Sequence, residues 1–270
     1  MRFKSSPWLH RYAILVALCA LVAIATGAIV TSLVRPIGAT PAASINPAFE
    51  FWHSIIGSAA LVFMLGLVIG IRSQLGWIGF SAAVLGAALH QFAPILHAVL
   101  AQIFFGAVVG VALTTSASWK RGPEPIEDSW RPSLRSLALA IPAIVLLQTT
   151  LGASYRYRAL GVIWHILNAM LVLLLILIVA VFLIRQFPQH PTLRPTAVAV
   201  AVITSIQVLL GFTTFLMLIL FPETSLAVVI SSVLHVSTGA LTFGASVALA
   251  LQIRFNAQGP PVTHRSVTAT

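Results

Sequence analysis

Residues 160–184 of the chain read LGVIWHILNAMLVLLLILIVAVFLI, an apolar run without a single charged side chain. A run of about 20 apolar residues is long enough to cross the hydrocarbon layer of a bilayer as an α-helix. Runs of similar length recur along the chain, separated by short polar breaks. Because backbone groups left unpaired in lipid are costly, this pattern predicts an all-α integral membrane protein.

The composition of the 270 residues agrees with a lipid environment. Hydrophobic residues make up 59% of the chain and charged residues 7%, and the mean hydropathy is +1.02. A chain this apolar cannot fold around one core in water. We predict eight transmembrane helices, over residues 12–34, 51–71, 75–91, 94–117, 134–154, 160–184, 196–221 and 226–254. The third span is the shortest, and it contains Gly76, Gly79 and Gly86.

The basic residues predict the orientation in the membrane. The chain has 15 Lys and Arg residues against 5 Asp and Glu residues, a formal net charge of +10. With the N-terminus inside, twelve of the basic residues fall on the cytoplasmic side and three on the outer side. Cytoplasmic loops of membrane proteins carry such an excess, so the charge does not indicate nucleic acid as a partner. We expect a multi-pass protein of the cell (inner) membrane with both termini in the cytoplasm.

The longest polar stretch, Ser118 to Ser133, divides the eight spans into two sets of four. We expect an N-terminal half over 1–118, a cytoplasmic linker over 119–133 and a C-terminal half over 134–270. An even number of spans in each half gives both halves the same direction across the membrane. The sequence therefore predicts two four-helix bundles related as a parallel repeat.

A short pattern of glutamine and glycine agrees with this repeat. Gln148-x-x-x-Gly152 recurs as Gln207-x-x-x-Gly211, and each copy precedes a span with one histidine near its outer end. Glycine in a membrane helix also allows close helix packing, which is the simpler interpretation of Gly152 and Gly211.

Four of the eight histidines lie near the outer ends of the even-numbered spans: His53, His97, His165 and His235. Burying an unpaired histidine in a membrane is costly, so each is a candidate for a functional role. One pair falls in each half, His53 with His97 and His165 with His235. His90, near the outer end of the third span, competes with His97 for its place in the N-terminal pair.

The available ligands favour haem over other metal sites. Imidazole binds zinc, copper and iron, but zinc and hard-cation sites usually add thiolates or carboxylates. The chain has one cysteine and five acidic residues. Haem needs only axial ligands from the protein, and helical bundles hold cofactors between facing helices. We therefore expect each histidine pair to ligate a haem iron.

Charged residues are few on the outer side. The basic ones are Arg35, Arg156 and Arg158. They are candidates to bind haem propionates because guanidinium groups pair well with carboxylates. The alternative is that they anchor the chain at the membrane–water interface. Glu50 precedes His53 by three residues, so both share one face if a helix begins there. Glu50 is then either an acid for proton transfer or a first-turn acid that favours the helix dipole.

Four segments are similar to one known family. They are Glu50-Phe-Trp-His53, His97-Ala-Val-Leu-Ala-Gln102, Gln148-Thr-Thr-Leu-Gly-Ala-Ser-Tyr-Arg156 leading to Trp164-His165, and His235-Val-Ser-Thr-Gly-Ala-Leu241. With these segments, the chain resembles the haem A synthase family, the cytochrome oxidase assembly proteins that convert haem O to haem A. The resemblance covers nearly the whole chain.

The resemblance implies an oxidoreductase that oxidises the C8 methyl group of haem O to a hydroxymethyl and then a formyl group. It implies that His165 and His235 hold a permanent haem b, while His53 and His97 receive the substrate haem. By the same resemblance, Glu50 is the catalytic acid. The implied partners are haem O synthase and other cytochrome oxidase assembly factors, and a homo-oligomer stays open.

The chain departs from this family mainly in its N-terminal half. It lacks the cysteine pair that some members carry in the first outer loop, and the first-loop signature is present only loosely in residues 27–35. The third span lacks the family's usual Gln and Gly-Gly-Leu-Thr-Val run. Two alternatives therefore remain: a two-haem membrane protein for electron transfer, of the cytochrome b kind, and a haem carrier without catalysis.

Overall fold

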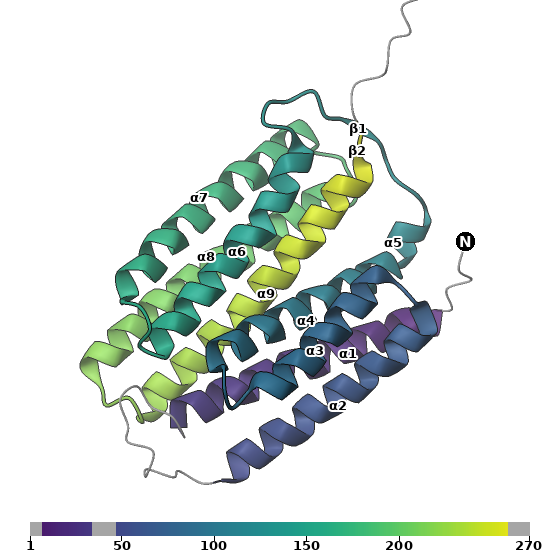
Figure 1. Cartoon of the computed structure of the whole chain (residues 1–270). Helices are drawn as coiled ribbons and strands as arrows, with labels where there is room; N and C mark the ends of the chain where they lie inside the picture. Colours follow the sequence, from purple (N-terminus) through teal and green to yellow (C-terminus); the bar gives the residue numbers. More distant parts are fainter. Residues whose placement is uncertain (1–6, 34–46, 259–270) are drawn as a thin grey trace, which may run out of the picture.

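The computed structural model describes residues 7–33 and 47–258, which form nine helices and one pair of short strands (Figure 1). In chain order the elements are α1 (Pro7–Leu33), α2 (Ala48–Ile71), α3 (Gln74–Leu89), α4 (Pro94–Thr114), α5 (Ala117–Lys120), β1 (Ile126–Glu127), α6 (Leu134–Arg156), α7 (Val162–Gln186), α8 (Leu193–Leu220), α9 (Leu226–Asn256) and β2 (Ala257–Gln258). Each predicted span corresponds to one of the eight longer helices, with bounds that differ by a few residues.

Seven of the helices in the described ranges are long and apolar enough to cross a membrane. The other long helix, α3, has 16 residues. At about 1.5 Å per residue it is roughly 24 Å long, which is short for a hydrocarbon layer of about 30 Å. The prediction of an all-α membrane protein is confirmed, and a full crossing by α3 stays a prediction.

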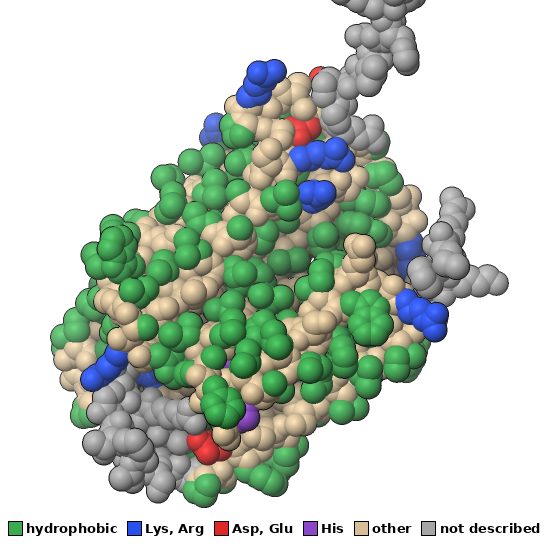
Figure 2. All heavy atoms as spheres, viewed as in Figure 1, with side chains coloured by type: hydrophobic (Ala, Val, Ile, Leu, Met, Phe, Trp, Pro, Cys, Tyr) green, Lys and Arg blue, Asp and Glu red, His purple; other side chains and the backbone are tan. Residues whose placement is uncertain are grey.

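The outer wall of the helices is apolar. Large hydrophobic side chains such as Trp77, Leu174 and Phe212 are more than half exposed, at 52%, 57% and 67%. Figure 2 shows hydrophobic side chains across the middle of the visible face and most of the Lys and Arg side chains toward its two ends. Such a surface is unfavourable in water and suits contact with lipid tails.

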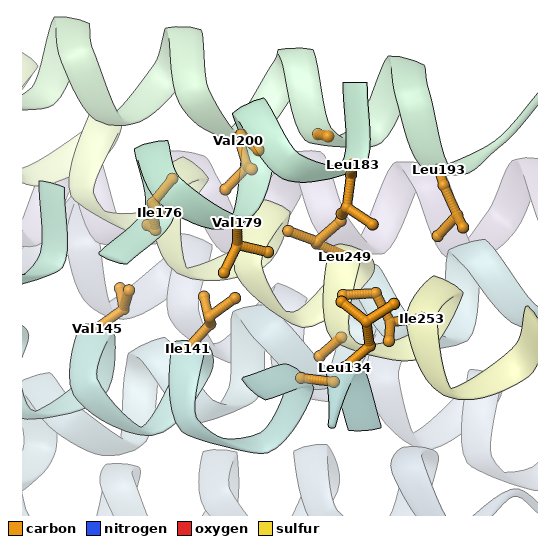
Figure 3. Packing of buried hydrophobic residues seen from close by; sticks show 14 of the residues in the cluster. Leu134, Ile141, Val145, Ile176, Val179, Leu183, Leu193, Val200, Leu249 and Ile253 are labelled. Carbon is orange, nitrogen blue, oxygen red and sulfur yellow. The ribbon is translucent and has the colours of Figure 1, made fainter. Parts of the chain in front are cut away.

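The helices pack in two rings. In one ring α1, α2, α3 and α4 each contact the next, and α4 contacts α1; helices α6 to α9 are arranged in the same way. Each ring has its own cluster of buried hydrophobic residues, around Met64 and Val108 in the first and around Ile176 and Leu249 in the second. Figure 3 shows side chains of the second cluster pointing into one shared space.

The two rings meet through α1, α4, α6 and α9 (Figure 1). At the contact of α4 with α9, a Cβ atom at Gly106 would lie 2.5 Å from the ring of Phe243. A Cβ atom at Gly244 would lie 2.8 Å from the ring of Phe105. Each phenylalanine therefore fills space that a glycine leaves on the other helix. In lipid, close packing of this kind holds helices together.

The polar linker is fixed to the second ring. The carboxylate of Asp128 accepts hydrogen bonds from the backbone N–H groups of Leu134, at 2.8 Å, and Arg135, at 3.1 Å. These N–H groups lie in the first turn of α6, where the helix itself supplies no acceptor. Strands β1 and β2 pair in parallel, with Ile126 opposite Ala257. The linker therefore joins the start of α6 to the end of α9.

Candidate functional site

The four predicted histidines form two pairs. The ring centroids of His53, on α2, and His97, on α4, lie 6.2 Å apart with an angle of 85° between the ring planes. The ring centroids of His165, on α7, and His235, on α9, also lie 6.2 Å apart, with an angle of 86°. The structure thus brings together the residues that the sequence analysis paired, and gives both pairs nearly the same geometry.

The ring separation fits one metal ion between the two rings of each pair. A metal at about 2 Å from each of two opposed ring nitrogens, which lie about 1 Å from their ring centres, separates those centres by about 6 Å. Among residues 7–33 and 47–258, no group of three or more His, Cys, Asp or Glu side chains is placed to hold a metal ion. Each site therefore offers two imidazoles, which is the ligand set that a bis-histidine haem requires from its protein.

Glycines of the preceding helices make room for the rings. Three rings lie directly against such a glycine, where a Cβ atom would come within 2.8–3.0 Å of the ring Cε1 atom: His53 against Gly27, His165 against Gly152 and His235 against Gly211. The fourth contact is looser, since a Cβ atom at Gly86 would lie 3.8 Å from Nδ1 of His97. From the sequence, Gly152 and Gly211 are predicted to serve helix packing, and their contact with the histidine rings is not predicted. The only sign of this contact in the sequence is that both glycines follow a glutamine by four residues.

The main chain holds the rings of the N-terminal pair. Nδ1 of His53 lies 3.1 Å from the carbonyl oxygen of Ala23 and 3.2 Å from the hydroxyl of Thr26. Nδ1 of His97 lies 2.9 Å from the carbonyl oxygen of Gly86. A carbonyl oxygen only accepts, so Nδ1 must carry the proton in both rings, and Nε2 keeps its lone pair. Metal-binding histidines usually have this arrangement, with the second nitrogen donating to an oxygen.

Glutamines approach the rings of the C-terminal pair. Nε2 of Gln148 lies 3.0 Å from Nδ1 of His165, and its Oε1 accepts a hydrogen bond of 2.8 Å from Asn168. In the other ring, Nδ1 of His235 is buried without a hydrogen-bond partner, as is Oε1 of Gln207. A buried polar group without a partner costs about 1–3 kcal/mol. The surroundings of the C-terminal pair therefore include two buried polar atoms that no described residue satisfies.

His90 is an exposed neighbour of the N-terminal pair. Its ring centroid lies 6.3 Å from that of His97, and its Nδ1 lies 2.8 Å from the carbonyl oxygen of Ala87. His97 therefore contacts both His53 and His90. Since His97 is the partner that faces His53, it is the better candidate for the second ligand of that site.

Glu50 lies in the first turn of α2 and its side chain is exposed. It is close enough to His53 to interact with its charge. Both residues belong to α2 and are three positions apart, so they share one face of this helix. An exposed carboxylate at the rim of a histidine pair can exchange protons with water and with a bound ligand.

The outer arginines have different surroundings. Arg156 is the last residue of α6, and its guanidinium group donates a hydrogen bond to the carbonyl oxygen of Thr31, on α1. Arg158 is exposed in the turn that follows, with a φ angle of 58°. Arg35 lies outside the described residues. The contact between Arg156 and α1 has no local signal in the sequence.

Comparison of the chain with profiles of known protein families found no match, and a search of curated proteins found no significant relative. The case for a function therefore rests on the histidine pairs and on the residues around them.

Proposed function

We propose that the chain is a haem A synthase, an oxidoreductase that converts the C8 methyl group of haem O to a formyl group during cytochrome oxidase assembly. The observation that carries the proposal is the presence of two histidine pairs with the same ring separation of 6.2 Å, one in each ring of helices. The sequence similarity around Glu50, His97, Gln148 and His235 supports this reaction over others that use two haems.

The same observations support two four-helix bundles that form a parallel repeat of eight spans. His97 and His235 are each followed after eight residues by a Phe-Gly pair, and these two pairs pack against each other. A repeat of this kind places both histidine pairs at the same depth in the membrane. With the basic residues on the inner side, this is the outer half of a cell membrane, and both termini are cytoplasmic.

The C-terminal pair, His165 and His235, would hold a permanent haem b. When bound there, haem b supplies one-electron redox chemistry. Gly152 and Gly211 keep the space that the two rings occupy. Nε2 of Gln148 lies 3.0 Å from Nδ1 and 3.3 Å from Nε2 of His165, so its amide contacts both ring nitrogens. Both histidines of this pair are half-buried between the helices of the second ring.

The N-terminal pair, His53 and His97, would bind the substrate haem O through Nε2. Carbonyl oxygens of the main chain already fix both rings with Nδ1 protonated, so ligation needs no change of tautomer. With water as the source of oxygen, oxidising the methyl group to a formyl group removes four electrons, which an electron acceptor outside the chain would take up, and four protons. Glu50 would accept protons at the rim and pass them to the outer aqueous phase. Arg35, Arg156 and Arg158 are the basic residues on the side where propionates would lie.

The experiment that tests the proposal is extraction of haems from membranes that contain this protein together with a haem O synthase. The extracted haems are separated by chromatography. Haem A or its hydroxymethyl intermediate, absent without the protein, is the expected result. Extracts that contain only haem b and haem O would favour the alternative, a two-haem electron-transfer protein or a haem carrier. The matched geometry of the two histidine pairs is also compatible with that alternative.

A further inference from the structure

Arg156 connects the two rings of helices at their outer ends. On its own helix it lies four residues after Gly152, and its guanidinium group donates to the carbonyl oxygen of Thr31. Thr31 lies four residues after Gly27 on α1. Four residues are about one helical turn. One turn therefore separates each end of this bridge from a glycine that lies against a histidine ring, Gly152 in one half and Gly27 in the other.

The charge of Arg156 suits this place. Thr31 belongs to the last turn of α1, where carbonyl groups have no partner within the helix and carry the negative end of its dipole. A guanidinium group both donates to such a carbonyl and offsets the dipole. Glu223, in the connection between α8 and α9, is close enough to Arg156 to interact with its charge, and its Oε2 atom is buried without a hydrogen bond.

Arg156 therefore acts on helices of both histidine pairs. It belongs to α6, which lies against His165, and it binds α1, which lies against His53. It also interacts with Glu223, three residues before the start of α9, which carries His235. Loss of the hydrogen bond from Arg156 would allow the outer ends of α1 and α6 to shift relative to each other. These ends lie one turn beyond Gly27 and Gly152.

We propose that Arg156 is a positioning residue that couples the two histidine pairs, by holding the last turn of α1, and with it Gly27, in the place that orients His53. The inference rests on the proposed function in that haem is the ligand that reports on each pair. A contact with haem propionates in its own half alone would make Arg156 act on the C-terminal site only. The bridge makes the N-terminal site depend on a residue of the C-terminal half.

Haem b titration into purified full-length protein tests this coupling. The His165→Ala variant leaves the N-terminal pair to be read by its low-spin absorbance, and the His53→Ala variant leaves the C-terminal pair. We expect Arg156→Gln to weaken haem b binding at the N-terminal pair about fivefold or more, the lower range of coupling between sites. Arg156→Lys, which keeps the charge, should restore most of the affinity. The control is Arg185→Gln, which changes an exposed arginine in the last turn of α7.

Two outcomes would overturn the inference: an effect of Arg156→Gln confined to the C-terminal pair, or no effect at either pair. If Arg156→Gln does not fold, Glu223→Gln replaces it, because this variant keeps the bridge and removes only the neighbouring charge. It should weaken the N-terminal site in the same direction by a smaller factor, and unchanged affinity would count against the coupling.

A second measurement does not depend on haem. Hydrogen exchange of backbone amides should become faster in residues 27–33 when Arg156 is changed to Gln, and should stay unchanged in Arg185→Gln. If the wild-type protein bound no haem b at the N-terminal pair, the proposed function would fail while this measurement still tested the bridge. Unchanged exchange in Arg156→Gln would overturn the bridge alone.

Discussion

Gly211 lies directly against the ring of His235, so that a Cβ atom at residue 211 would be 2.8 Å from Cε1 of the ring. Cβ atoms essentially never come this close to a neighbouring atom. A methyl group at this position must therefore displace the ring of His235 away from α8, or shift the helices themselves. Gly211, which the sequence marks as a helix-packing position, therefore also determines where the ring of His235 lies.

Gly211→Ala should lower haem b binding at the C-terminal pair by tenfold or more, because displacing one ring breaks the axial geometry. The measurement is low-spin haem absorbance per protein in the purified variant. Gly57→Ala is the matched control, since nothing lies within 4 Å of its added Cβ atom. In a helix interior, Ala is more favourable than Gly by about 1 kcal/mol, so the control should fold at least as well as the wild type. Equal haem content in both variants would contradict the role of Gly211.

His97→Ala should abolish haem binding at the N-terminal pair, whereas His90→Ala should leave most of it intact. The reason is that the ring centroid of His97 lies 6.2 Å from that of His53, whereas the exposed ring of His90 packs against His97 and its Nδ1 lies against its own main chain. Both variants are titrated with haem b in a His165→Ala background, where the C-terminal pair is silent. Loss of binding in His90→Ala together with normal binding in His97→Ala would exchange the roles of the two residues.

Glu50→Gln should stop the conversion of haem O at or before the hydroxymethyl stage, because the amide keeps the size of the side chain and cannot take up a proton. Haem b at the C-terminal pair should stay at the wild-type level. The haems are extracted from membranes at matched protein levels and separated by chromatography. Glu127→Gln, which changes an exposed acid of the linker, should convert haem O normally. Wild-type amounts of haem A from Glu50→Gln would contradict a catalytic role of Glu50 and favour the two-haem electron-transfer protein.

A reporter that fluoresces only in the cytoplasm, fused after Thr270, should be bright. This follows from an even number of spans with the N-terminus inside, which the twelve-to-three distribution of basic residues favours. The short helix α3 is the sensitive point, since without its crossing the number of spans is odd. A dark fusion that is fully expressed would mean that α3 does not cross the membrane.

The sequence predicts the helices well because the length of an apolar run is a local property. The run over 160–184 became α7, Val162–Gln186, with a shift of two residues at each end. The beginning of α1 was less accurate: the prediction started at residue 12 and the helix starts at Pro7. His10 lies within this earlier start of α1, with Nδ1 3.0 Å from the carbonyl oxygen of Ala112 on α4.

The surroundings of the histidines could be predicted only in part. That His53 approaches His97 follows from their places at the outer ends of spans in one half. The acceptor for Nδ1 of His53, the carbonyl oxygen of Ala23, depends on how α1 is rotated, and no local pattern encodes this rotation. The bond from Arg156 to Thr31 joins segments 125 residues apart and has the same origin.

The contact between α4 and α9 resembles the interface between two copies of one protein. Phe105 fills the space at Gly244, and Phe243 fills the space at Gly106. Each helix therefore contributes one phenylalanine and one glycine to the same reciprocal contact. This reciprocity defines the isologous interface of a two-fold symmetric homodimer. A single polypeptide that keeps such an interface internally is what duplication and fusion of a gene for a self-associating four-helix protein would produce.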